Sequence, residues 1–138
     1  MAGVFPDSDW LAAFEQCLNT SEKYARTASQ WEGDIVFEIL AEGPLESNTY
    51  YYLDLWHGKC RSARIIENND EEEPTFILTA PYSNFARVVK GDLDPMQALL
   101  TRKLTVKGNM GYMMRNVPTV LEFVKCAQNV TDKVLGDD

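Results

Sequence analysis

The spacing of apolar residues changes near residue 34, and this change limits the folds that the chain can adopt. From Ile35 onward, apolar residues recur at every second position, as in a strand with one buried face. Five strands are predicted, at 35–41, Thr49–Trp56, Lys59–Ile66, 75–79 and 104–107. His57-Gly58 fits a two-residue hairpin turn between the second and third strands, because glycine readily adopts positive φ. Since the middle connections are short, we expect a largely antiparallel sheet.

Segments on both sides of the predicted strands have apolar residues at helical spacing. Helices are predicted at 8–18, at 20–31, at Tyr82–Lys90, directly after Asp94, at 111–115 and at 118–133. Asn19 and Glu22 form a capping signature for the second helix. Gly91 ends the third helix and Asp94 caps the fourth. Together these elements predict an α/β fold of the α+β type, with helices covering one face of the sheet.

The length and the charge of the chain restrict its function. A chain of 138 residues suffices for one core, and we expect a single domain spanning 1–138. With 21 acidic and 13 basic residues, its net charge of −8 repels the phosphate backbone, so no nucleic-acid partner is expected. No apolar stretch approaches the roughly 18 residues of a membrane span, and the N-terminus lacks a secretion signal. We therefore expect a cytoplasmic protein without stable membrane insertion.

The sequence shows no pattern typical of catalytic or metal-binding residues. The single histidine, His57, falls in a predicted turn, where a catalytic histidine would need a nucleophile and an orienting group. Cys17, Cys60 and Cys126 are odd in number and far apart, unlike paired metal ligands or a disulfide framework. The acidic run at 67–73 lacks the glycine and the ligand spacing of a calcium loop. We predict no catalytic residues, no metal and no cofactor, and hence a protein that is not an enzyme.

The stretch from Val88 to Met114 holds the most specific signals of the sequence. These are Gly91, Asp94-Pro95, Leu104, Val106 and the run Gly-Asn-Met-Gly at 108–111. Their spacing resembles that of the sterol carrier protein type 2 (SCP-2) family, and the chain looks like a stand-alone member of the prokaryotic type. The resemblance implies a hydrophobic tunnel between sheet and helices. It also implies non-catalytic binding, and by extension intracellular transfer, of fatty acids, fatty acyl-CoA or sterol-like lipids.

The tunnel implied by this resemblance would be lined by apolar residues of the strands and the later helices. The expected lining residues are Phe37, Ile39, Leu53, Leu55, Phe85, Val88, Val89, Met96, Leu99, Leu100, Leu104, Val106, Met110, Met113, Met114 and Leu121. Without the resemblance, the same residues fit an ordinary core. A tunnel of about 300 Å³ would cost on the order of 7 kcal/mol if unfilled, so a bound lipid should stabilise the fold.

Basic residues are concentrated around the same stretch. Arg102 and Lys103 are expected near the tunnel mouth, where they would hold a carboxylate, a phosphate of acyl-CoA or an anionic membrane surface. A simple solvated face would contain the same residues. Salt-dependent binding of acyl-CoA would favour a role at the mouth.

Two other functions remain open from the sequence. Tyr50, Tyr52 and Trp56 fall on the strand face opposite the expected core, and such a row of rings would suit a homodimer or another protein partner. Packing under a loop explains the row equally well. Alternatively, the chain is an accessory substrate-binding module for a lipid-handling enzyme, since domains of the family it resembles occur fused to enzymes.

Overall fold

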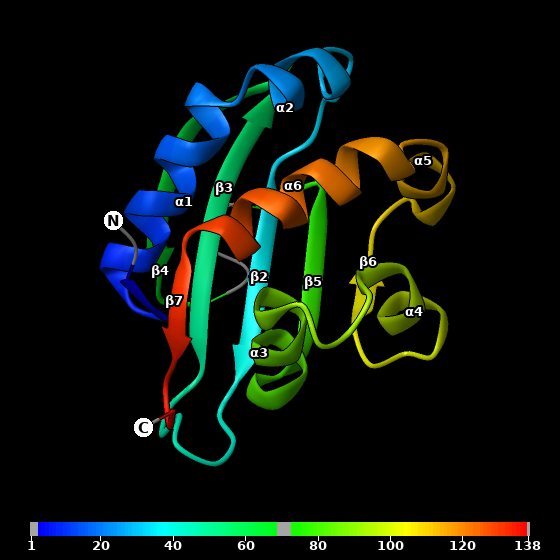
Figure 1. Cartoon of the computed structure of the whole chain (residues 1–138). Helices are drawn as coiled ribbons and strands as arrows, with labels where there is room; N and C mark the ends of the chain where they lie inside the picture. Colours follow the sequence, from blue (N-terminus) through cyan, green and yellow to red (C-terminus); the bar gives the residue numbers. More distant parts are fainter. Residues whose placement is uncertain (1–2, 69–72, 138) are drawn as a thin grey trace.

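A five-stranded sheet forms one layer of the computed structural model, which describes residues 3–68 and 73–137 (Figure 1). Its strands are β2 (Ile35–Leu40), β3 (Thr49–Trp56), β4 (Lys59–Ile66), β5 (Phe76–Pro81) and β6 (Thr105–Lys107). They lie in the order β4-β3-β2-β5-β6. β2 and β5 are parallel and the other neighbours are antiparallel, so the predicted five-stranded, largely antiparallel sheet is confirmed. Part of the acidic run at 67–73 lies outside the described residues.

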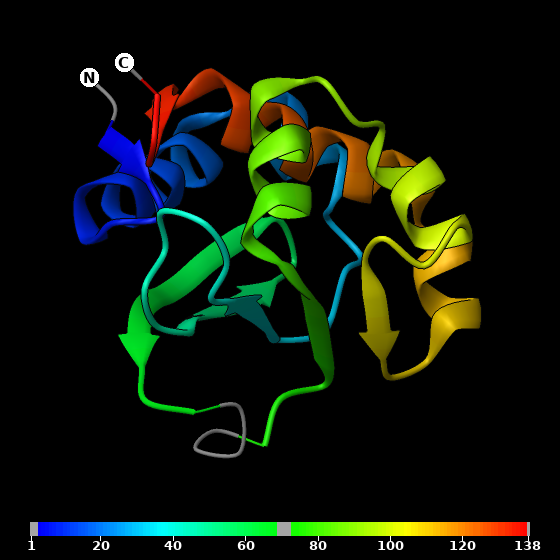
Figure 2. The same cartoon turned by 90° about the horizontal axis from the view of Figure 1, so that it is seen from below.

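The helices lie on one side of the sheet or along its β6 edge (Figure 2). They are α1 (Ser8–Thr20), α2 (Glu22–Thr27), α3 (Tyr82–Lys90), α4 (Pro95–Leu100), α5 (Met110–Arg115) and α6 (Val117–Asn129). Because side chains alternate along a strand, Tyr51, Leu53 and Leu55 of β3 all point toward this layer. Each is almost fully buried. The core therefore lies between the helices and the sheet.

Local turn and capping signals place several elements as predicted. His57 and Gly58 have φ values of 49° and 81°, as the two-residue hairpin between β3 and β4 requires. Gly91 ends α3 with a φ of 87°. The Asp94 carboxylate accepts a hydrogen bond of 3.2 Å from the backbone N–H of Gln97 and so caps α4. These predictions are confirmed.

The second helix is shorter than predicted and has a different cap. It does not fill 20–31, and Ser21 caps it by accepting a 3.1 Å hydrogen bond from the backbone N–H of Tyr24. The Asn19 side chain instead donates to the carbonyl of Cys60 and accepts from its N–H, both at 2.8 Å. The predicted local cap is therefore wrong, because Asn19 bonds to the distant strand β4.

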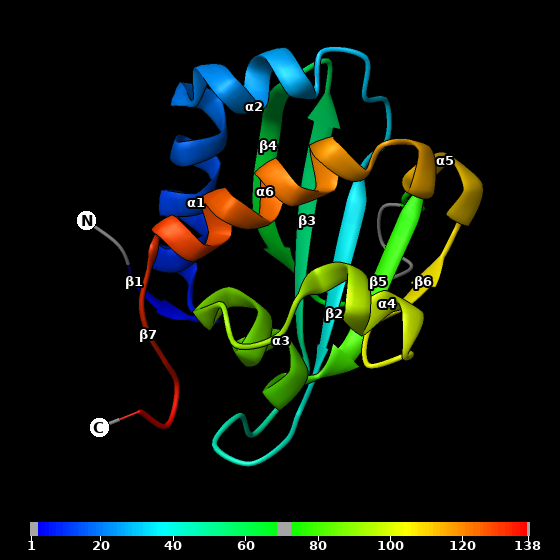
Figure 3. The ribbon, with the colours of Figure 1, turned by 45° about the vertical axis from the view of Figure 1, so that its right-hand side comes forward.

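The last helix ends earlier than predicted because the chain then pairs with its own N-terminal segment. α6 ends at Asn129, and the predicted continuation to 133 is wrong. Instead, β7 (Thr131–Val134) runs parallel to β1 (Gly3–Phe5) in a two-stranded sheet. The backbone N–H of Leu135 also donates to the carbonyl of Phe5 at 2.9 Å. The first and last strands of the chain thus lie side by side (Figure 3).

The other face of the sheet does not present the expected open row of three rings. Tyr52 is only 8% exposed, and the Arg64 guanidinium lies 4.8 Å from the centre of its ring. The Tyr52 hydroxyl donates to the Asp34 carboxylate at 2.8 Å. Tyr50 is half-buried, and Trp56 is 39% exposed. Homodimerisation through these rings stays a prediction without support from the packing.

Candidate functional site

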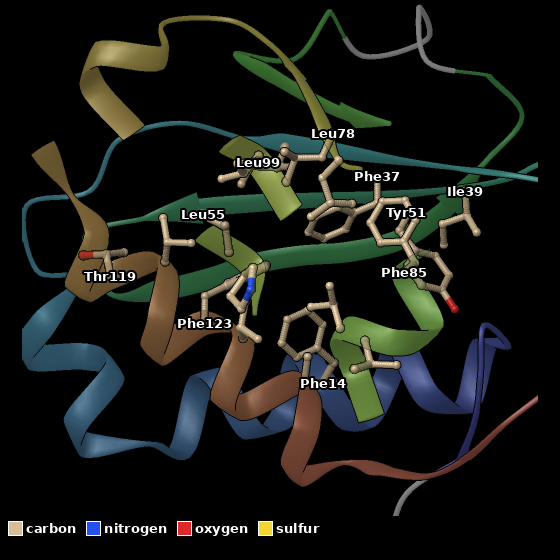
Figure 4. A pocket seen from close by; sticks show the side chains of 18 of the residues that line it. Phe14, Phe37, Ile39, Tyr51, Leu55, Leu78, Phe85, Leu99, Thr119 and Phe123 are labelled. Carbon is tan, nitrogen blue, oxygen red and sulfur yellow. The ribbon is translucent and has the colours of Figure 1, made fainter. Parts of the chain in front are cut away.

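A cavity of about 90 Å³ lies between the helix-facing side of the sheet and the helices (Figure 4). Its lining residues are Phe5, Trp10, Phe14, Tyr24, Trp31, Ile35, Phe37, Ile39, Tyr51, Leu55, Leu78, Phe85, Val88, Val89, Pro95, Leu99, Leu104, Met113, Thr119, Val120, Phe123, Val124 and Ala127. A cavity is therefore present between the two layers, where the tunnel was expected. At about 24 cal/mol per Å³, a cavity of this size costs about 2 kcal/mol.

The wall of the cavity is apolar, and most of its polar side-chain atoms form hydrogen bonds within the protein. None of its lining residues is charged. The hydrogen bonds of its polar side chains include Trp10 Nε1 to Thr131 Oγ1 (2.8 Å), Trp31 Nε1 to Gly33 O (2.9 Å), Tyr51 OH to Asp7 O (3.0 Å) and Thr119 Oγ1 to Thr27 O (3.1 Å). Burying a charge or an unpaired polar group against such a wall is unfavourable. The cavity therefore suits the apolar part of a molecule.

The titratable groups beside the cavity are held in their neutral forms. Burial raises the pKa of Tyr24 above its usual value, and the nearby thiols of Cys60 and Cys126 add to the effect. Burial also raises the pKa of Tyr51. The pKa of the Cys60 thiol and that of the Cys126 thiol both rise to about 12, again mainly through burial. A protonated thiol is a weak nucleophile, so these cysteines are suited to packing.

One aromatic side chain joins α6 to the opposite wall. The ring of Phe123 lies 4.8 Å from that of Phe14 on α1 and 5.8 Å from that of Phe37 on β2, measured between ring centres. It also lies 6.4 Å from the ring of Tyr24 on α2. Aromatic pairs at these separations are favourable beyond the area that they bury. Phe123 therefore fixes the distance between α6 and the sheet, and with it the width of the cavity (Figure 4).

The cavity reaches solvent on one side. Phe37 and Leu78 are register partners on β2 and β5, and both are partly exposed although they face the helices. Val120 and Val124 of α6, which also line the cavity, are partly exposed too. The most accessible part of the wall is therefore formed by residues of α6, β2 and β5.

The structure places nine of the sixteen predicted lining residues on the cavity wall: Phe37, Ile39, Leu55, Phe85, Val88, Val89, Leu99, Leu104 and Met113. The other seven, Leu53, Met96, Leu100, Val106, Met110, Met114 and Leu121, do not line it. Leu53 is fully buried in the core beside the cavity. Met96 and Val106 are half-buried at its margin, on α4 and β6.

The remaining four residues are exposed because they lie on the outer sides of helices. Leu100 is 66% exposed, since adjacent helical residues point about 100° apart and Leu99 takes the inward direction. Met110 and Met114, four residues apart, share an outer face of α5. Leu121 lies on the outer side of α6. Of the four methionines expected in the lining, Met96, Met110, Met113 and Met114, only Met113 lines the cavity.

The two predicted headgroup residues lie outside the cavity wall. Arg102 and Lys103 follow the end of α4, and both are exposed. Arg102 adopts a left-handed backbone conformation with a φ of 62°, which residues other than glycine rarely adopt. Lys103 immediately precedes Leu104, which does line the cavity. The pair is thus next to the cavity along the chain but does not enter it.

Sequence reasoning missed the part of the wall that comes from the two ends of the chain. The main omissions are Phe5, Trp10 and Phe14 at the N-terminal end, and Val120, Phe123, Val124 and Ala127 on α6. Helical spacing predicts that Trp10, Phe14, Val120, Val124 and Ala127 are buried. It does not distinguish a residue beside a cavity from one in solid core. Knowledge that α1 and α6 face the same side of β2 would have identified them.

Within residues 3–68 and 73–137, no group of three or more His, Cys, Asp or Glu side chains is arranged to hold a metal ion. Over the same part of the chain, no helix is both long enough and apolar enough to cross a membrane.

Comparisons with known proteins agree with this geometry. A family model described as the SCP-2 sterol transfer family matches residues 8–120. No curated protein matches the chain. The chain is similar to the crystal structure of a sterol carrier protein 2, with 32% sequence identity and a TM-score of 0.81. The similarity covers 88% of this chain and 95% of that one.

Two further solved structures are similar. The solution structure of a conserved hypothetical protein from Thermus thermophilus, whose description suggests a sterol carrier protein, is 30% identical with a TM-score of 0.83, covering 95% of this chain and 93% of that one. The apo form of sterol carrier protein 2 from Yarrowia lipolytica shares the fold, with 22% identity, a TM-score of 0.59 and coverage of 94% and 97%. The chain therefore belongs to the SCP-2 sterol transfer family.

Proposed function

We propose that the protein, acting as a single domain of residues 1–138, binds fatty acids, fatty acyl-CoA or sterol-like lipids in its cavity and carries them within the cytoplasm without catalysing a reaction. The observation that carries this proposal is the wall, which has no charged side chain and whose polar groups are largely paired within the protein. Membership of a sterol transfer family supports the same class of ligand.

The apolar wall also predicts how such a ligand is oriented. A carboxylate or phosphate would find no charged partner among the residues that line the cavity. Its burial there would be strongly unfavourable. We therefore place the lipid tail against Phe14, Phe37 and Phe123, and the polar head at the most accessible part of the wall, beside Val120 and Val124.

A long lipid needs more room than the cavity offers. The volume of about 90 Å³ is below the roughly 300 Å³ at the low end for ligand pockets. Widening the cavity to about 300 Å³ would cost about 5 kcal/mol before the space is filled. Each buried methylene contributes about 0.8 kcal/mol, so about six methylenes offset this cost. A lipid tail longer than that is expected to move the helices apart and hold them there.

Affinity is therefore expected to depend on tail length. Saturated fatty acids with few methylenes should bind weakly, and each further methylene should lower Kd by about fourfold until the cavity is full. Isothermal titration below the micelle-forming concentration of each acid measures this series. Dicarboxylic acids of the same lengths are the matched control, because their second carboxylate would have to enter the apolar wall. Equal affinity for the two series would contradict the proposed orientation.

Native mass spectrometry of freshly purified protein tests the function without a choice of ligand. We expect a mass increment of lipid size that disappears on denaturation. A protein that carries no such increment, and whose melting temperature ignores added palmitate, would contradict the proposal. A role as an accessory module of a lipid-handling enzyme stays a prediction, for which co-purification of an enzyme is the test.

A further inference from the structure

Positive charge is unevenly distributed along this acidic chain. Residues 95–121 contain four of the 13 basic residues and none of the 21 acidic residues. The four are Arg102, Lys103, Lys107 and Arg115, and all are exposed. A net charge of −8 keeps most of the protein away from anionic surfaces. This segment is therefore the part of the sequence best suited to approach one.

These four cations are free of the ion pairs that other basic residues make. Within the described part of the chain, Lys23 and Lys125 pair with Glu122, and Arg61 pairs with Asp54. No such pair is formed by Arg102, Lys103, Lys107 or Arg115 with any described residue. Their positive charge is therefore available to an external partner.

Exposed apolar side chains lie in the same segment as these cations, and each is next in sequence to a residue that lines the cavity. Leu100 is 66% exposed and Met114 is 39% exposed. Neighbours along the chain point in different directions, since Leu99 lines the cavity beside exposed Leu100, and Met113 lines it beside exposed Met114. In the same way, Leu104 lines the cavity next to exposed Lys103. α4, the residue Leu104 before β6, and α5 thus contribute to the cavity wall, while exposed residues next to them contribute to the outer surface.

We propose that this outer surface docks on an anionic lipid bilayer. We call it the basic edge and define it by Leu100, Arg102, Lys103, Lys107, Met114 and Arg115. This inference rests on the proposed lipid-binding function, since the segments that carry the basic edge also contribute Leu99, Leu104 and Met113 to the cavity wall. Exposed apolar side chains among unpaired cations are typical of surfaces that lie in the headgroup region of a membrane.

The spread of the cations favours a bilayer over one soluble phosphate group. Arg102 and Lys103 follow α4, whereas Arg115 ends α5, and these helices lie at opposite ends of β6 along one side of the molecule (Figure 3). A single phosphate would need cations that converge on one point. A bilayer surface presents many negative charges to an extended edge.

Co-sedimentation with vesicles tests the docking without any ligand in the cavity. The protein should bind vesicles of mixed phosphatidylglycerol and phosphatidylcholine, bind weakly to phosphatidylcholine alone, and dissociate as salt rises. The double variant Lys103→Gln/Lys107→Gln should bind the anionic vesicles about 25-fold more weakly, at about fivefold per cation. The matched control Lys59→Gln/Lys133→Gln removes the same charge from β4 and β7, and we expect little change because salt screens charges beyond about 10 Å.

A second variant separates docking from folding. Arg102→Gly removes a cation from a position whose φ of 62° favours glycine. We expect this variant to raise Tm by roughly 2–6 °C while weakening binding to anionic vesicles by about fivefold. A variant that gains stability and loses docking cannot owe the loss to misfolding.

The proposal would be overturned if the unaltered protein did not bind anionic vesicles, or if the two double variants lost binding equally. It would also be overturned if the variants of the basic edge bound palmitoyl-CoA more weakly in solution while their binding to vesicles was unchanged. The last result would assign the cations to a soluble headgroup. In each case palmitate binding in solution reports separately on the cavity, so a failure of docking is distinguishable from a failure of the proposed function.

Discussion

Replacing Phe123 by Ala is expected to lower the free energy of unfolding by about 3–5 kcal/mol, as for other buried phenylalanines. Its ring packs against Phe14 on α1 and Phe37 on β2, and so connects the helices with the sheet across the cavity. The total stability of a domain of this size is only about 5–15 kcal/mol. The variant should therefore be markedly less stable in urea or thermal unfolding, and its cavity should be larger.

The same variant is expected to gain more from a bound lipid than the unaltered protein does. Removing the ring adds apolar space that a lipid tail can fill, so palmitate should raise its melting temperature by a larger amount. Differential scanning fluorimetry with and without palmitate measures the two shifts. The lipid therefore replaces part of the packing that the mutation removes.

Phe76→Ala is the matched control for this effect. Phe76 is 1% exposed and packs against Trp31 and Tyr112, but it does not line the cavity. Its loss should be similarly destabilising, because a buried ring is removed in both cases. The shift caused by palmitate, however, should stay that of the unaltered protein. If palmitate stabilised the two variants by equal amounts, the lipid would not be filling the space beside Phe123.

Elements whose ends are marked by local chemistry could be predicted from the sequence to the residue. The strands Thr49–Trp56 and Lys59–Ile66 are bounded by the hairpin turn at His57-Gly58, where two consecutive residues adopt positive φ. α3 ends at the left-handed Gly91. Such signals involve only residues close together in the chain, so they need no knowledge of the tertiary structure.

Elements decided by distant partners could not be predicted. Thr131–Val134 forms a strand because it pairs with Gly3–Phe5 near the other end of the chain, although local spacing favours a longer helix there. Asn19 is of a residue type common at helix caps, yet its side chain forms hydrogen bonds with the backbone of Cys60, 41 residues away. In both places a long-range hydrogen bond replaces the locally favoured structure.

The candidate site shows the same division. Apolar residues of the sheet and of α3 could be predicted to face the helix layer, because alternation and helical spacing show which way they point. The same spacing does not separate Leu55, which lines the cavity, from Leu53, which lies in the core. In α4 and α5, which have six residues each, the pattern is too short to separate Leu99 from Leu100 or Met113 from Met114. The volume of the cavity depends on how rings such as Phe123 interlock, which no pattern of spacing specifies.

Replacing Gly58 by Ala is the second change with a large expected effect, of about 2–5 kcal/mol in the free energy of unfolding. Part of the loss, about 1–2 kcal/mol, arises because alanine disfavours the φ of 81° that the hairpin turn requires. The rest arises from crowding, since a Cβ atom at this position would lie 2.5 Å from the carbonyl oxygen of Ala25. That atom belongs to the backbone of α2, so either the helix or the hairpin has to move, which typically costs about 1–3 kcal/mol.

Gly43→Ala separates the two contributions. Gly43 also has a positive φ, of 56°, but nothing lies within 4 Å of the Cβ that would be added there. Its replacement should therefore cost only the conformational part, about 1–2 kcal/mol in urea unfolding. Equal losses for the two variants would show that α2 yields without cost. Because α2 carries Tyr24 of the cavity wall, a displaced α2 should also weaken palmitate binding in Gly58→Ala, whereas Gly43→Ala should bind as the unaltered protein does.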